Sequence, residues 1–135
     1  MTMLYLEYIN KEKKIIYSSA GHEHIIHYQS KNNRCLPIKS GGFMLGMLPE
    51  ISEMLEQREF SLDVGDKIVL YTDGATEAEN NKRERFGLNR LIQSVERNAQ
   101  KNAQGLLDSL YQEIKNFMNN YPQYDDITLI SMEKT

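Results

Sequence analysis

The sequence predicts an α+β domain, because its hydrophobic pattern changes period partway along the chain. Up to about residue 72, short apolar runs alternate with polar or glycine-rich segments, as in a succession of β-strands. After Asp73-Gly74 the apolar residues recur every three or four positions, which is typical of amphipathic helices. With 135 residues and 40% hydrophobic content, the chain is long enough for one domain and too short for two.

The first four apolar runs predict a meander of β-strands. Met3–Ile9 and Ile15–Ser19 are separated by a polar stretch and predict a β-hairpin. Ile25–Tyr28 and Cys35–Ile38 are also separated by polar residues and predict a second pair of strands joined by a solvated turn.

Glycines and a turn signal divide the middle of the chain. The glycines in the segment 40–46 flank three apolar residues and predict a loop that these side chains pack down. No phosphate loop is predicted, since the Lys-Ser/Thr pair that it requires is absent. A run from Met54 to Leu62 follows, then the turn signal at 63–66. Lys67–Thr72 has a continuous apolar centre and predicts a strand buried on both faces.

The last part of the chain predicts two helices and a strand. The first helix has its apolar face at Leu88, Leu91, Ile92 and Val95. The second is predicted from about Gly105 to Met118, with its face packed on a sheet. This face comprises Leu107, Leu110, Tyr111, Ile114, Phe117 and Met118. Residues 127–132 predict the final strand.

Composition excludes several classes of protein. The 16 Lys and Arg against 19 Asp and Glu give a net charge of -3 without long runs of one sign, which argues against a nucleic-acid surface. No apolar stretch approaches the roughly 20 residues of a membrane helix, and the amino terminus lacks the features of a signal peptide. We therefore expect a cytoplasmic location and no membrane contact in this segment. Cys35 has no partner cysteine and is assigned no chemistry.

Two acidic clusters lie at predicted strand ends. Asp73 directly follows the most buried of the predicted strands, and Gly74 follows it at a turn of the backbone, a common location for catalytic groups. Asp125 and Asp126 precede the final strand, and such adjacent carboxylates repel unless a cation, a donor or solvent offsets them. Mg²⁺ and Mn²⁺ prefer oxygen ligands of this kind.

Spacing alone leaves simpler interpretations open. An isolated Asp-Gly after a strand is more often a turn, and Asp-Asp before a strand is usually a solvated loop. His24 and His27 are three residues apart in an extended segment, so they point to opposite faces and are poor co-ligands. His22 is expected to bind loop backbone rather than metal. Ser18 and Ser19 lack a recognisable base and orienting acid, which argues against a nucleophilic serine.

Six short motifs are more informative in their order along the chain than any one of them is alone. The motifs are Ser19-Ala20-Gly21-His22, Gly41-Gly42-Phe43-Met44-Leu45-Gly46, Leu62-Asp63-Val64-Gly65-Asp66, Leu70-Tyr71-Thr72-Asp73-Gly74-Ala75-Thr76-Glu77-Ala78, Phe86-Gly87 and Asp125-Asp126-Ile127-Thr128-Leu129. Together they resemble the metal-dependent type 2C protein phosphatase superfamily. The resemblance is closer to its bacterial branch typified by stage II sporulation protein E and the general stress-response regulators, and it runs from about Met3 to Met132.

This resemblance implies a fold and a metal site. It implies a β-sandwich between helices, in four layers ordered αββα, with two Mn²⁺ or Mg²⁺ ions that activate a bridging water at one end. Asp73 matches one ligand and Asp125 another, so both are the candidate catalytic and metal-binding residues. Gly74 and Asp126 are additional candidates for the metal site, and Asp126 matches the supporting neighbour of the ligand.

One expected part of the family pattern is missing. No Asp-x-x-Gly-His occurs in the sequence, and in the family this motif precedes the segment matched by Met1-Thr2-Met3. We therefore expect residues 1–135 to be the carboxy-terminal portion of a phosphatase domain that lacks its amino-terminal portion. An incomplete active site is then expected, with apolar surface left for association into a homo-oligomer.

The resemblance also implies a function for the parent protein. That function is removal of phosphate from a regulatory phosphoprotein, such as an anti-anti-sigma factor. The alternatives are a non-catalytic interaction module on the same scaffold, and a metal-binding domain without phosphatase activity. Saturable Mn²⁺ binding is expected of the metal-binding domain and not of the interaction module.

Overall fold

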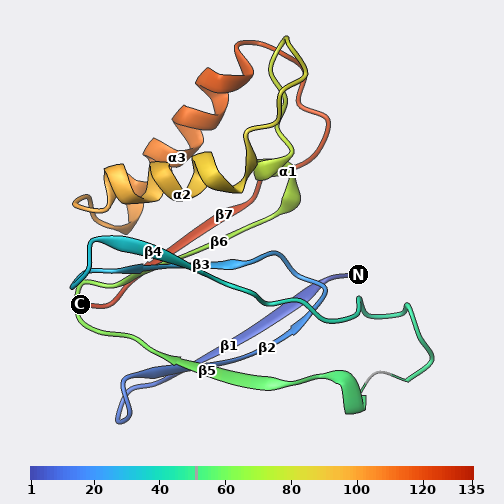
Figure 1. Ribbon diagram of the computed structural model, residues 1–135, viewed down its shortest axis with the longest axis vertical. Coiled ribbons are helices and arrows are strands. Elements are labelled where there is room, and N and C mark those ends of the chain that lie inside the picture. The colour runs from blue at the N-terminus through green and yellow to red at the C-terminus, as the bar shows by residue number, and fades with distance from the viewer. Residues whose placement is uncertain (51) are drawn as a thin grey trace.

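The computed structural model describes residues 1–50 and 52–135, and it arranges them in three layers (Figure 1). A three-stranded sheet forms one layer, a four-stranded sheet lies against it, and two helices cover the far side of the four-stranded sheet. Along the chain the elements are β1 (Met3–Ile9), β2 (Lys14–Ala20), β3 (Ile25–Gln29), β4 (Arg34–Ile38), the 3-10 helix η1 (Ser52–Met54), β5 (Gln57–Ser61), β6 (Lys67–Tyr71), α1 (Asp73–Thr76), α2 (Gly87–Asn98), α3 (Ala103–Met118) and β7 (Leu129–Glu133).

Both sheets are antiparallel throughout. The strand order is β1-β2-β5 in one and β4-β3-β6-β7 in the other. The predicted hairpin and the second strand pair are confirmed as β1-β2 and β3-β4. The run predicted from Met54 to Leu62 instead divides into the end of η1 and the shorter strand β5. The last strand is displaced from the predicted 127–132, because ladder pairing with β6 begins only at Leu129.

Side chains alternate between two cores, as the period of a strand requires. Ile25 of β3 and Ile68 of β6 point into the layer between the sheets. Their neighbours Ile26 and Val69 point the other way, toward the helices. Four-fifths of β6 is buried, which explains its continuous apolar centre.

A buried acidic residue fixes the turn before β6. Asp66 accepts hydrogen bonds from the Ser30 backbone nitrogen at 2.8 Å, the Ser30 hydroxyl at 2.9 Å and the Asp63 backbone nitrogen at 3.1 Å. Its other contact is His27 Nε2 at 2.8 Å, and that ring packs against Phe60 of the opposite sheet. Burial alone raises the pKa of the Asp66 carboxyl, but these hydrogen bonds outweigh it and leave the pKa below its ordinary value.

The helices pack their apolar faces on the four-stranded sheet. At the start of α3 the Asn102 side chain accepts from the Gly105 backbone nitrogen at 2.8 Å, and Asn119 ends the helix in a left-handed conformation. The predicted face of this helix is partly wrong. Its buried residues are Leu106, Leu110, Ile114 and Met118, whereas Leu107 and Phe117 are half-buried and Tyr111 is exposed. Spacing of four residues keeps the first set on one line over the sheet.

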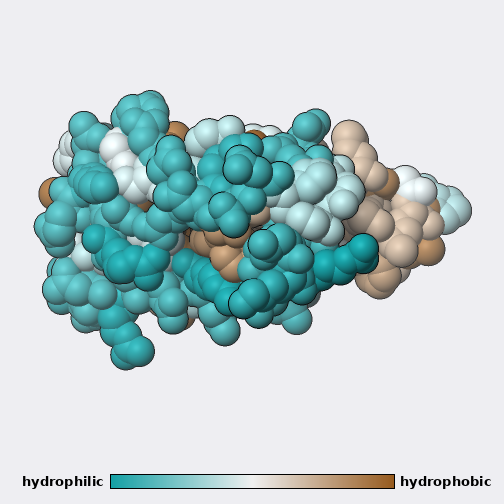
Figure 2. Space-filling model, turned by 90° about the horizontal axis from the view of Figure 1, so that it is seen from above, coloured by the Kyte–Doolittle hydropathy of each residue, from teal (hydrophilic) through white to brown (hydrophobic). Residues whose placement is uncertain are grey.

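Apolar side chains remain exposed away from the helices. Seen from above, the surface is mostly hydrophilic and apolar residues gather at one end (Figure 2). The loop after β4 projects on that side, and its exposed apolar residues include Phe43, Met44, Met47 and Leu48, with Met54 at the end of η1. Within residues 1–50 and 52–135, none of the helices has both the length and the apolar character needed to cross a bilayer.

Candidate metal centre

The ends of β6 and β7 bring the two acidic clusters together. The strands pair up to Tyr71 and Leu129. Beyond them, the Thr72 backbone nitrogen donates to the Thr128 carbonyl oxygen at 3.1 Å, and the Thr128 backbone nitrogen donates to Thr72 Oγ1 at 3.0 Å. The residues that follow β6 and precede β7 are therefore held side by side, although more than fifty positions separate them in the sequence.

Gly74 is packed directly against the second cluster. A Cβ placed on Gly74 would lie 2.3 Å from the Asp126 carbonyl oxygen, closer than any side chain tolerates. The same carbonyl oxygen accepts a hydrogen bond from Thr72 Oγ1 at 3.0 Å. Glycine is required at this position because the two backbones touch, and this contact joins the Asp73-Gly74 and Asp125-Asp126 segments.

The carboxylates of the two candidate ligands each accept a hydrogen bond from the backbone nitrogen of the next residue. Asp73 opens the one-turn helix α1, and its Oδ1 accepts from the Gly74 backbone nitrogen at 3.0 Å. Asp125 Oδ1 accepts from the Asp126 backbone nitrogen at 2.8 Å. Both side chains are exposed. Each carboxylate is thus oriented by one backbone donor and still offers lone pairs on the solvent side, as a metal ligand must.

Two neighbouring hollows open beside these carboxylates. Asp73 lines one with Glu23, His24 and Tyr71, and Asp125 lines the other. Glu77 and Arg85 form an ion pair of 2.8 Å and line both hollows. Burial, followed by the nearby Glu23 carboxylate, raises the pKa of Tyr71 to about 12, so this phenol is neutral at physiological pH.

The donor set fits part of a Mg²⁺ or Mn²⁺ site. Oxygen is the donor that these ions prefer, and Asp73 and Asp125 supply it. No group of three or more His, Cys, Asp or Glu side chains suited to holding a metal occurs in residues 1–50 and 52–135. An ion bound by Asp73 and Asp125 alone would retain most of its water ligands.

Three other residues considered from the sequence, His27, His22 and Cys35, lie away from the acidic clusters or contact only the loop backbone. His27 is buried and bound to Asp66. His22 meets the loop through its backbone, since its carbonyl oxygen accepts from Ser40 Oγ at 2.6 Å. Burial, followed by Glu96, raises the pKa of the Cys35 thiol to about 12, which leaves little of the reactive thiolate.

The two glycine motifs of the first half pack against each other. Gly42, with a φ of +90°, lies so close to β2 that a Cβ would be 2.7 Å from the Ser19 carbonyl oxygen. Gly21, with a φ of +67°, faces Met44 at a similarly short distance. These contacts fix the start of the loop after β4.

Several residues beside the acidic clusters were missed from the sequence. Arg83, Tyr121 and Tyr124 line the hollow that contains Asp125. All three belong to loops, where no hydrophobic period distinguishes one polar position from another. Only the proximity of the loops after α1 and after α3 reveals them.

Comparison with known structures defines the fold. The SiaA-PP2C domain of Pseudomonas aeruginosa matches with a TM-score of 0.83 at 16% identity, covering 98% of this chain and 51% of that one. The phosphatase domain of SpoIIE from Bacillus subtilis, presoaked with Mn, matches with a TM-score of 0.74 at 13% identity, covering 98% and 56%. The fold is that of the PP2C-type phosphatase domains, of which residues 1–135 form a part.

Sequence comparison defines the family. The chain belongs to the stage II sporulation protein E (SpoIIE) family, whose model matches residues 1–135. It is 33% identical over 138 residues to phosphoserine phosphatase RsbU of Bacillus subtilis (strain 168). That alignment covers 99% of this chain and 39% of RsbU. The family assignment and the mixed sheet and helix fold expected from the motifs are therefore confirmed.

Proposed function

We propose that residues 1–135 are the carboxy-terminal portion of a metal-dependent phosphoprotein phosphatase domain, with Asp73 and Asp125 as metal ligands. The observation that carries this proposal is the contact of Gly74 with the Asp126 backbone, which joins two acidic segments distant in sequence. The 33% identity to a phosphoserine phosphatase supports hydrolysis of a phosphate ester as the reaction.

The residues of the site have two different roles. Asp73 and Asp125 would hold Mn²⁺ or Mg²⁺, and Gly74 and Asp126 keep the two segments in contact. Two such ions supply a polarised water and charge stabilisation for in-line attack. In the reaction, the bond from phosphorus to the serine or threonine oxygen breaks and water supplies the new oxygen on phosphorus. A proton from the attacking water passes to the leaving serine or threonine oxygen, which is released as the hydroxyl.

We propose further that this site is completed by residues outside 1–135. The chain spans 39% of the length of RsbU, and residues 1–50 and 52–135 contain no group of three or more His, Cys, Asp or Glu side chains that could hold a metal. Mg²⁺ and Mn²⁺ favour six oxygen ligands, so two carboxylates add little to the hydrated ion. The isolated chain is accordingly inactive and binds Mn²⁺ weakly.

The substrate that the family resemblance favours is a cytoplasmic regulatory phosphoprotein of the anti-anti-sigma type. The exposed apolar side chains on the loop after β4, including Phe43 and Met47, favour self-association of the isolated chain.

The test is Mn²⁺-dependent hydrolysis of p-nitrophenyl phosphate by the 135-residue chain and by the whole protein that contains it. The chain alone should stay near background and the whole protein should be active. Asp73→Asn in the whole protein should abolish turnover, because it replaces a charged ligand by a neutral one of similar shape. The matched control is Asp63→Asn, which removes an exposed carboxylate away from the site. A whole protein indifferent to Asp73→Asn would refute the catalytic assignment.

A non-catalytic interaction module is the second candidate. The observation that favours it is the shortage of ligands within residues 1–50 and 52–135. It predicts that the whole protein is inactive with Mn²⁺, whereas a metal-binding domain without phosphatase activity would still bind Mn²⁺ saturably.

A further inference from the structure

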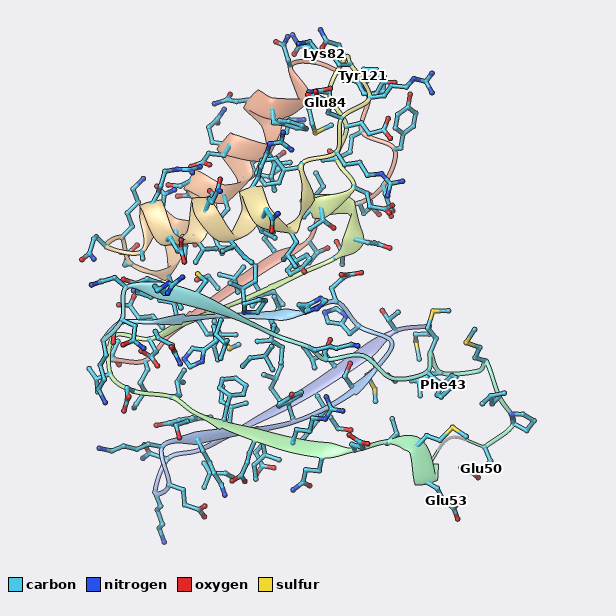
Figure 3. All side chains as sticks on the ribbon, in the orientation of Figure 1. Phe43, Glu50, Glu53, Lys82, Glu84 and Tyr121 are labelled. Carbon is cyan, nitrogen blue, oxygen red and sulfur yellow. The ribbon has the colours of Figure 1, made fainter. Side chains whose placement is uncertain are left out.

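The hollow beside Asp125 has the features of a place for the substrate polypeptide. Its volume is about 320 Å³, and its lining runs from Gly74 and Asp125 at the candidate metal centre to the loops after α1 and α3. Figure 3 shows Lys82, Glu84 and Tyr121 together at the end of the molecule where these loops meet. A chain whose phosphoserine reached Asp125 would therefore lay its neighbouring residues along this hollow.

One wall of the hollow is a rigid hairpin. Asn80 Oδ1 accepts from the backbone nitrogens of Lys82 at 2.9 Å and Glu84 at 3.0 Å, and the Asn80 side-chain nitrogen donates to Glu84 Oε2 at 2.8 Å. A further backbone bond of 2.8 Å joins Phe86 to Ala78 at the base. The loop is thus held in one shape before any substrate arrives, which lowers the entropy cost of binding.

Arg83 is one of three charged residues that this hairpin presents to the hollow, together with Glu79 and Arg85. Its φ of +61° is a left-handed conformation that side-chain-bearing residues seldom adopt. Across the described part of the chain, no carboxylate forms an ion pair with Arg83, whereas the neighbouring Arg85 is paired with Glu77. The Arg83 guanidinium is therefore free to bind a carboxylate of another molecule. A guanidinium binds a carboxylate through two parallel hydrogen bonds.

The opposite wall is aromatic. Tyr121 and Tyr124 pack edge to face with ring centroids 5.8 Å apart, and Tyr124 is 74% exposed. Tyr121 is tied to the end of α3 through its backbone nitrogen, which donates to the Met118 carbonyl oxygen at 2.8 Å. Exposed tyrosines of this kind supply contact area for a bound polypeptide at low entropy cost.

Resting on the proposed phosphatase function, we propose that this hollow binds the substrate segment next to the phosphoserine, and that Arg83 selects an acidic residue there. Arg83 is a specificity-determining residue and takes no part in the chemistry. Its pairing with the substrate lowers KM for phosphoproteins with acidic flanks. A substrate without flanking residues, such as p-nitrophenyl phosphate, gains nothing from it.

The test uses the whole protein and synthetic phosphoserine peptides of one length, with either aspartate or lysine at the positions flanking the phosphoserine. The wild-type protein should prefer the aspartate peptide by roughly fivefold in kcat/KM, the size expected for one exposed charge pair. Arg83→Glu should invert this preference. Lys82→Glu, which makes the same charge change on the same hairpin but off the hollow, should leave the preference near the wild-type value.

p-Nitrophenyl phosphate separates the possible failures. Lys82→Glu should hydrolyse it at the wild-type rate, and thermal unfolding near the wild-type temperature shows that Arg83→Glu is folded. An active protein whose Arg83→Glu variant keeps the wild-type peptide preference overturns the subsite and leaves the phosphatase function standing. A wild-type protein that hydrolyses neither peptide nor p-nitrophenyl phosphate with Mn²⁺ overturns the phosphatase function and the subsite with it.

Discussion

At Gly74, the space of a single methyl group decides whether two segments of the site can meet. A Cβ there would lie 2.3 Å from the Asp126 carbonyl oxygen, and backbone atoms on both sides have little room to withdraw. Gly74→Ala should therefore lower the free energy of unfolding by about 1–3 kcal/mol, the usual cost of overpacking. It should also abolish Mn²⁺-dependent activity in the whole protein.

Gly105→Ala is the matched control for this prediction. Gly105 lies in α3, where the nearest atoms to an added Cβ are at 3.2 Å and belong to side chains. Thermal unfolding of both variants measures the difference. A Gly74→Ala protein as stable and active as the control would show that the contact with Asp126 is not required.

Asp66 carries the second residue-scale prediction. All of its partners are donors or a histidine ring nitrogen, so Asp66→Asn sets an amide NH₂ against them. The variant should lose about 1–3 kcal/mol of unfolding free energy at pH 7, as expected when a buried hydrogen-bond network is left unsatisfied. Asp63→Asn, at an exposed carboxylate nearby, is the control and should change little.

The pKa of Asp66 also fixes how this stability depends on pH. The pKa is lower in the folded protein than in the unfolded chain, where it is about 4. The contribution is therefore fully present above about pH 5 and is lost as the pH falls through the folded-state pKa. Urea unfolding from pH 7 to pH 3 should show a smaller loss of stability for Asp66→Asn than for the wild type. Parallel curves would contradict the role given to Asp66.

The helix α3 is held by its line of fully buried residues. Leu110 has no exposed surface, so Leu110→Ala should cost about 2–5 kcal/mol in unfolding free energy through lost burial and the cavity left behind. Tyr111 is adjacent in sequence but 48% exposed, and Tyr111→Ala should stay within about 0.5 kcal/mol of the wild type. An equal loss of unfolding free energy in the two variants would mean that the face containing Leu110 is not the one packed on the sheet.

The same helix shows how far hydrophobic period carries a prediction. The period identified two helices and the approximate ends of the second, because apolar residues three and four apart must share a face. The period could not identify the residues at the middle of the buried face. Leu106 and Leu107 are both leucine, and only the position of the sheet decides which of them is buried. The strand pairs β1-β2 and β3-β4 were predictable because each consists of two apolar runs separated by a short polar segment. The end of β7 was not, because its pairing with β6 is non-local.

At the candidate site, the local spacing of residues predicted less than it did for the helices. Asp73-Gly74 and Asp125-Asp126 each read as ordinary turns or loops when taken alone, and their order among the family motifs singled them out. Their contact depends on the pairing of β6 with β7 across more than fifty residues. Arg83 and Tyr124 carry no local signal, because they come together only when two loops fold to the same end of the molecule.

At the scale of the whole molecule, the layers account for the position of the site. The inter-sheet core and the helix-facing core both converge on β6, and the chain leaves β6 directly into Asp73. A rigid central strand therefore positions one candidate ligand, while its neighbour β7 positions the other. The claim that follows is that Asp73 and Asp125 act as one unit in binding metal.

The most direct test of that claim is Mn²⁺ titration by calorimetry of the whole protein, with Asp73→Asn, Asp125→Asn and the double variant. Each single change should weaken Mn²⁺ binding by at least about tenfold. The double variant should lose less than the sum of the two free-energy costs, because groups that share a ligand field are coupled. Wild-type affinity in both single variants, or fully additive losses in the double variant, would contradict the assignment of Asp73 and Asp125 to one site.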